Sequence, residues 1–92
     1  MRRVFDHLHA ELSVGVGRLV SRYALWLRLR EVGLDPERLT PAEALGFCRR
    51  HLGAFLAEQG LALAARPARR LERELGRFDP ARPTPYERAA RV

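Results

Sequence analysis

The sequence predicts a compact all-α domain in which a long N-terminal helix packs with a two-helix hairpin and a short C-terminal helix. Three observations favour it: apolar residues recur at helical spacing, no segment alternates like a strand, and proline and glycine signals divide the chain. The length of 92 residues predicts a single domain over 1–92. A chain this short buries a small share of its surface, so a partner chain would add stability.

The first predicted element covers residues 4–32, as one long helix or two in line. Its apolar face comprises Val4, Leu8, Leu12, Val16, Leu19, Tyr23, Trp26 and Leu27, and residues 23–29 are expected to be largely buried. A straight helix of this length would measure about 43 Å, more than the expected diameter of the domain. It therefore either bends near Gly15 and Gly17 or packs against a second copy of itself.

Proline and glycine signals place the other helices at 41–59, 67–78 and 85–91. Gly33 suits a C-terminal cap, and Asp35-Pro36 suits a single short turn. Thr40-Pro41-Ala42-Glu43 contains an N-cap hydroxyl, a first-turn proline and a capping-box glutamate. The apolar stripe expected on helix 41–59 consists of Leu45, Cys48, Leu52, Phe55 and Leu56.

A ridge of small residues on the first helix predicts a homodimer. It comprises Ala10, Ser13, Gly17, Ser21 and Ala24, which a continuous helix would hold within about 80° of one another. Small side chains allow a second helix backbone to approach closely. Phe47 points about 130° away from the stripe of its own helix, so it either packs under the first helix or lies at an interface.

The stretch SVGVGRLVSR, residues 13–22, resembles a phosphate-binding loop only superficially. A P-loop requires Gly-Lys-Ser/Thr, and the chain has no lysine. A dinucleotide fingerprint requires a third glycine where Val20 stands, and neither motif would follow a strand here. The glycines are therefore interpreted as structural.

An arginine ridge on the third helix is the strongest candidate for binding a polyanion. The ridge comprises Arg66, Arg70, Arg73 and Arg77, which would lie within about 60° of one another around the helix axis. Arg69 lies close to this ridge. Guanidinium groups spaced along one helix face can follow a phosphate backbone. Glu72 and Glu74 dilute the charge, and no aromatic residue interleaves, so the alternative is a solvated charged face.

Metal binding and catalysis find little support. His7 and Glu11 are weak candidates for binding one metal ion, because residues four apart lie on the same side of a helix. His7 and His9 are two residues apart and point in different directions. Cys48 and His51 lack an orienting acid in the sequence. We therefore expect no metal, no cofactor, no small-molecule substrate and no enzymatic activity.

The amino-acid composition predicts the kind of organism and the cell compartment in which the protein occurs. The net charge is +6, and all 17 basic residues are arginine, which suits a GC-rich genome. The absence of asparagine, with few glutamines, cysteines and methionines, suits a thermophile. A single cysteine and the lack of a signal-peptide pattern predict the cytoplasm, and no apolar run is long enough for a membrane.

The function expected from these features is a non-enzymatic interaction module, homodimeric, that binds a macromolecular partner. The alternative is a nucleic-acid-binding protein that contacts phosphates through the arginine ridge. An acidic protein partner and a metal-dependent enzyme around His7 and Glu11 are more distant alternatives.

Overall fold

A computed structural model of the chain describes residues 3–85 and 87, and within them it is all-helical. The predicted fold class is confirmed. The elements in chain order are α1 (Val4–Val16), α2 (Arg22–Glu31), the 3-10 helix η1 (Pro36–Arg38), α3 (Pro41–Arg50), α4 (Leu52–Glu58) and α5 (Ala65–Gly76).

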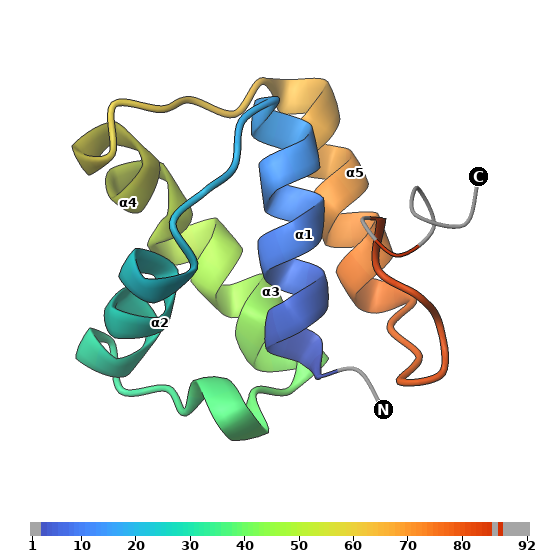
Figure 1. Cartoon of the computed structure of the whole chain (residues 1–92). Helices are drawn as coiled ribbons and strands as arrows, with labels where there is room; N and C mark the ends of the chain where they lie inside the picture. The colour runs from blue at the N-terminus through green and yellow to red at the C-terminus, as the bar shows by residue number, and fades with distance from the viewer. Residues whose placement is uncertain (1–2, 86, 88–92) are drawn as a thin grey trace.

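The helix α1 is the centre of the arrangement. It runs antiparallel to α5 on one side, packs on α3, and has α2 on its other side (Figure 1). The helices α3 and α5 also pack on each other, as expected of the two later helices. The largest fully buried side chains are three phenylalanines and the leucines around them: Phe5, Phe47, Phe55, Leu8, Leu12, Leu25, Leu29 and Leu75.

The prediction of one helix over 4–32 is wrong, because the chain turns between α1 and α2. Gly17 has a φ of 82°, in the left-handed region that favours glycine, and its N–H donates to the carbonyl oxygens of Ser13 and Val14. Ser21 then begins α2 by accepting a hydrogen bond from the N–H of Ala24, at 3.1 Å. The bend expected near Gly15 and Gly17 is therefore a complete break.

Side chains of α1 hold the segment between the two helices in place. The N–H of Val20 donates to Ser13 Oγ at 3.0 Å, and the carbonyl oxygen of Val20 lies 2.7 Å from His9 Nε2. A carbonyl oxygen can only accept, so Nε2 of His9 is the donor. The Val20 side chain is only 1% exposed. Both backbone groups of this buried residue are thus satisfied, as burial requires.

The break also changes which side chains are buried. Leu19 and Tyr23, expected on the apolar face, are 76% and 70% exposed, whereas Phe5 and Val20, at the edge of that face, are buried. A turn between two helices resets the helical phase, so positions beyond Gly17 no longer continue the stripe of α1. Residues 23–29 are only partly buried, with Leu25 and Leu29 inside the core.

The predicted helix 41–59 is likewise two helices, α3 and α4, separated at His51. The φ of His51 is −126°, outside the helical range. The interruption lets Ala44 and Phe47 of α3 enter the core together with Leu52, Phe55 and Leu56 of α4, while Leu45 and Cys48 are only half-buried. Phe47 is 1% exposed, so it packs inside the molecule and not at an interface.

The predicted helix boundaries that rest on capping residues are confirmed. Thr40 Oγ1 accepts from the N–H of Glu43 at 3.1 Å, and the Glu43 carboxylate accepts from the N–H of Thr40 at 3.0 Å. The helix predicted at 67–78 is α5, which begins and ends two residues earlier than predicted. The start signal at Thr84 and Glu87 forms the same reciprocal bonds, but the helix predicted over 85–91 falls mainly on residues outside the described part of the chain.

Candidate functional site

The arginines predicted to bind a polyanion lie on the solvent face of α5. All five are exposed: Arg66, Arg69, Arg70, Arg73 and Arg77. The first four line a shallow groove of about 520 Å³ between the start of α5 and the last turn of α1, whose other walls are Val14, Gly15 and Pro67. We call it the arginine groove. Arg77 follows α5 directly, at the opposite end of that helix, and is not part of the groove.

Gly15 lines this groove close to Leu63 and Pro67. A Cβ atom at this position would lie 3.0 Å from Leu63 Cδ1 and 3.4 Å from Pro67 Cβ. The 3.0 Å contact is tighter than ordinary van der Waals contact, so a larger residue at Gly15 would require the Leu63 side chain to move slightly, whereas the contact with Pro67 of α5 would be an ordinary one. The two glycines of SVGVGR have separate roles: Gly15 lines the groove, and Gly17 ends α1.

Three arginines of the groove have no acidic partner. Among the described residues, no carboxylate lies within ion-pairing distance of Arg66, Arg69 or Arg73. Arg70 is the exception, with its Nη1 3.8 Å from the buried carboxylate of Glu11. The groove therefore presents positive charge that the protein itself leaves largely uncompensated.

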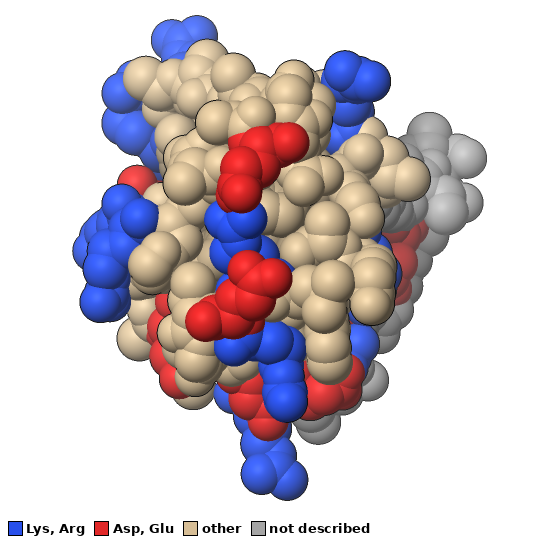
Figure 2. All heavy atoms as spheres, turned by 90° about the vertical axis from the view of Figure 1, so that its left-hand side faces the viewer, with Lys and Arg blue, Asp and Glu red and all other residues tan. Residues whose placement is uncertain are grey.

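Acidic residues instead neutralise arginines elsewhere on the surface. Arg28 pairs with Glu31 and Glu58, and Arg49 pairs with Glu72 at 2.8 Å. Figure 2 shows the result on the face that carries α2: acidic and basic side chains alternate down its middle, while basic side chains at its upper edge have no acidic neighbours in view. Charge is thus mixed over that face, whereas the groove gathers three of the arginines that have no acidic partner among the described residues; others, such as Arg18 and Arg50, lie elsewhere.

Glu72 and Glu74, expected to dilute the arginine ridge, point away from the groove. Glu72 pairs with Arg49 of α3. Glu74 lies 3.7 Å from Arg77 and 3.6 Å from Arg82. Neither carboxylate lines the groove. The sequence could not show this separation, because it depends on which neighbouring helix each glutamate reaches.

The histidines have structural partners. His9 donates to the carbonyl oxygen of Val20, and Nε2 of His7 lies 3.1 Å from the carbonyl oxygen of Arg82, so it is also a donor there. A nitrogen that donates a hydrogen bond is not free to bind a metal. Within the described residues, no group of three or more His, Cys, Asp and Glu side chains is arranged to hold a metal ion.

Cys48 is a poor nucleophile in this fold. Burial, together with the nearby carboxylate of Glu72, raises the pKa of its thiol to about 12. At neutral pH almost none of the reactive thiolate is present. His51 lies against Phe47, with ring centroids 6.0 Å apart. The Cys48–His51 pair thus has no feature of an activated nucleophile.

The ridge of small residues predicted for a dimer does not exist as one helical face. Ala10 and Ser13 are each 2% exposed within the chain, Gly17 and Ser21 belong to the turn, and only Ala24 lies within α2. The physical reason is the break at Gly17, since the five positions share a face only on a continuous helix.

Sequence reasoning missed one feature of the surface, the aromatic pair on α2. Tyr23 is 70% exposed and Trp26 is half-buried, although both were expected in the core. The available signal was the spacing of Gly17 and Ser21, since a glycine four residues before a serine fits a C-cap followed by an N-cap.

Comparisons with known proteins leave these surfaces to be interpreted on their chemistry alone. No protein-family model matches the chain, and no curated protein or solved structure matches it either. Within the described residues, no helix is both long and apolar enough to cross a membrane.

Proposed function

We propose that the protein is a non-enzymatic interaction module that binds a nucleic acid by its phosphates, across the arginine groove. The observation that carries the proposal is the set of three exposed arginines that have no acidic partner within the described part of the chain, Arg66, Arg69 and Arg73. Long side chains of one charge, gathered beside a groove, produce a local positive potential that attracts anions.

The spacing of the groove arginines suits a repeating anion. Arg66, Arg69 and Arg73 lie on one face of α5 and span about 10 Å along its axis, at 1.5 Å per residue. Each guanidinium can donate two parallel hydrogen bonds to one phosphate. A linear polyanion therefore fits this surface better than a single small anion would.

A structural role for these arginines is the competing explanation. The last turn of α1 carries no basic residue of its own, and its C-terminus lies beside the start of α5. Cations near a helix C-terminus stabilise it by about 0.3–1 kcal/mol. The test must therefore separate a loss of binding from a loss of stability.

The experiment compares two arginine variants for binding to a fluorescent oligonucleotide at low salt. We expect the triple variant Arg66→Ala, Arg69→Ala, Arg73→Ala to bind at least tenfold more weakly than the native protein. The matched control is Arg50→Ala, because Arg50 is also an exposed helical arginine without an acidic partner among the described residues, but lies outside the groove. Equal weakening by both variants, or a triple variant that binds normally, contradicts the proposal.

Catalysis has no part in the proposal. The high pKa of the Cys48 thiol disfavours a role as a nucleophile, and one ring nitrogen of both His7 and His9 already donates a hydrogen bond. A metal-dependent enzyme at His7 and Glu11 is the least supported alternative, since the cavity beside them is only about 10 Å³.

The homodimer stays a prediction. The break at Gly17 removes its main argument, a projecting helix of 29 residues, but Val14, Leu19 and Tyr23 remain as exposed apolar side chains that a second copy would cover. Light scattering at micromolar concentration tests it directly. A mass of twice the 10.5 kDa chain supports the dimer, and a mass equal to the chain excludes it at that concentration.

A further inference from the structure

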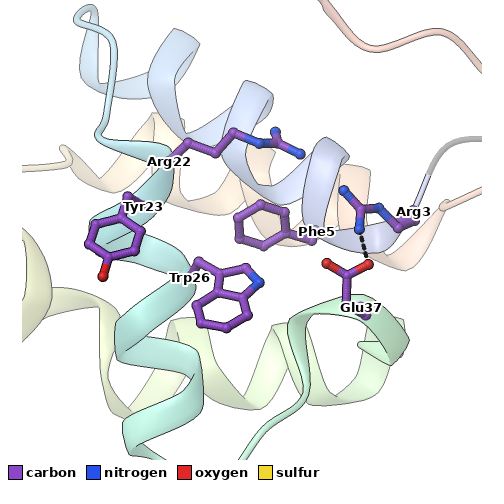
Figure 3. A pocket seen from close by; sticks show the side chains of 6 residues that line it. All are labelled: Arg3, Phe5, Arg22, Tyr23, Trp26 and Glu37. Atoms are coloured by element: carbon purple, nitrogen blue, oxygen red, sulfur yellow. Dashed lines mark hydrogen bonds and ion pairs between the residues drawn. The ribbon is translucent and has the colours of Figure 1, made fainter.

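A second cavity lies on the other side of α1, where α1, α2 and η1 meet. Its volume is about 460 Å³, within the range of ligand-binding pockets. Figure 3 shows its lining, in which side chains from the three elements converge: Arg3, Phe5, Arg22, Tyr23, Trp26 and Glu37. We call it the aromatic pocket.

Aromatic rings at this pocket are open to a ligand. Tyr23 and Trp26 are three residues apart on α2, so they lie side by side on one face of the helix. Tyr23 is 70% exposed, and Figure 3 shows Trp26 pointing from α2 toward Phe5 of α1. The exposed Tyr23 ring is a platform on which another planar ring can stack, and the half-buried Trp26 lies beside it, packed against the core.

The charged groups at the pocket are two arginines and the carboxylates they pair with, since Arg3 binds Glu37 and Asp6 and Arg22 binds Asp6. The guanidinium of Arg22 already lies 4.8 Å from the centre of the Phe5 ring, and that of Arg30 lies 5.5 Å from Trp26. Among the described residues, Phe5 and Trp26 thus each already have one of the protein's own cations near a ring face, whereas Tyr23 has none. Arg22 pairs with Asp6 through one terminal nitrogen, which leaves other N–H groups to donate to a phosphate.

The chain itself connects the aromatic pocket with the arginine groove. Residues 17–21 run from the end of α1, beside the groove, to Arg22 at the start of α2 (Figure 1). Arg18 in this segment is exposed and has no carboxylate partner among the described residues. Arg18 thus places one positive charge on the segment between the two sites.

The two sites lie on opposite sides of α1, which restricts the kind of nucleic acid that can reach both. Phe5 of the pocket and Val14 of the groove are nine residues apart, which places them about 180° apart around the helix axis. Duplex DNA is stiff over about 150 base pairs, so it cannot wrap around a domain 34 Å long. A flexible single strand can follow the curved path.

We propose that the aromatic pocket stacks a base of a single-stranded nucleic acid whose backbone continues along residues 17–21 to the arginine groove. Tyr23 and Trp26 provide the stacking surface, and Arg22 binds the adjacent phosphate. The inference rests on the function proposed above and adds that the nucleic acid is single-stranded.

The test uses Trp26 as its reporter, because it is the only tryptophan in the chain. The full-length protein is titrated with a thymidine 12-mer, with a duplex of equal length, and with inorganic polyphosphate, which has phosphates but no bases. We expect the single strand to bind most tightly and to change Trp26 fluorescence. Tyr23→Ala should weaken single-strand binding about tenfold and leave polyphosphate binding unchanged, while Tyr23→Phe should bind as the native protein does.

The outcomes separate this inference from the proposed function. If the single strand and polyphosphate bind equally and neither changes Trp26 fluorescence, the pocket does not stack a base, while the arginine groove remains a phosphate site. Tighter binding of the duplex also overturns the inference alone. If no anion binds at low salt, the proposed function fails as well. Arg50→Ala, remote from both sites, should leave every titration unchanged.

Discussion

Gly17 decides where the first helix ends, because its backbone adopts a conformation that other residues avoid. Its φ of 82° closes α1 with bonds to Ser13 and Val14, and the buried Val20 follows on the way to α2. No atom lies within 4 Å of the Cβ that another residue would add there. The requirement for glycine is therefore conformational and not steric.

Gly17→Ala should destabilise the protein by about 1 kcal/mol, through backbone strain alone. Gly53→Ala is the matched control, since Gly53 lies inside α4 with open space around its Cβ position and without a positive φ. That variant should gain about 0.5–1 kcal/mol from better helix propensity. Urea denaturation measures both, and a loss of the same size for the two variants would contradict this account of Gly17.

Capping residues were the most predictable features of this sequence. Thr40 with Glu43, Gly33, and Thr84 with Glu87 act as their types predict, because a cap depends on groups only a few residues away. Gly17 and Ser21 follow the same chemistry. In the sequence, however, an apolar pattern of helical spacing continues across these two residues, so the pattern alone does not indicate a cap pair.

At the scale of elements, the contact between α1 and α5 builds the arginine groove. At this contact Gly15, in the last turn of α1, lies close to Leu63 and Pro67. The sequence predicted the helix α5 and its arginines, but it could not predict that Val14 and Gly15 would form the opposite wall. That pairing depends on the packing of residues about 50 positions apart in the chain.

Gly15→Leu should push α1 and α5 apart and cost about 1–3 kcal/mol, the range typical of overpacking. Gly53→Leu places the same side chain on α4 where nothing lies within 4 Å, so it should not destabilise the protein and should gain helix propensity as Gly53→Ala does. Thermal unfolding followed by circular dichroism compares the two. Similar melting temperatures for both variants would show that the close approach at Gly15 is not tight.

Asp6 links α1 to α2 and makes part of the stability dependent on pH. Burial raises the pKa of its carboxyl group, but hydrogen bonds from Arg22 and Arg3 outweigh this effect, so the net pKa is below the ordinary value of 3.8. A lowered pKa means that folding favours the carboxylate. Its contribution is therefore complete above that ordinary value and is lost as the pH falls through the lower, folded-state pKa.

Asp6→Asn should cost up to about 1 kcal/mol at pH 7, since the ion pair with Arg22 is partly exposed to solvent. Below the folded-state pKa the native protein should approach the stability of the variant. Urea unfolding between pH 7 and pH 2 measures the difference. A difference that stays constant over this range would contradict the assignment.

At the scale of the whole molecule, the positions of the charged side chains are more informative about function than the net charge is. A net charge of +6 fits many proteins, but here acidic residues pair with arginines away from the groove and leave Arg66, Arg69 and Arg73 without acidic partners among the described residues. The sequence identified these arginines from their spacing alone. It could not assign the partners of Glu72 and Glu74, which depend on tertiary contacts.

Overall shape explains why the long helix expected from the sequence does not form. The molecule measures 34 × 26 × 22 Å, so a straight helix of about 43 Å would leave part of its apolar face exposed. Folding back at Gly17 buries Val20, Leu25 and Leu29 instead. Hydrophobic burial in a small domain thus outweighs the continuity of a local helical pattern.

The salt dependence of oligonucleotide binding tests the central claim, the phosphate-binding role of the arginine groove, most directly. For single strands, each phosphate contact contributes about −0.7 to the slope of log K against log salt concentration. If Arg66, Arg69 and Arg73 each hold one phosphate, their joint replacement by alanine should make the slope less steep by about 2, while Arg50→Ala leaves it unchanged. Identical slopes for the native protein and the triple variant would contradict the account.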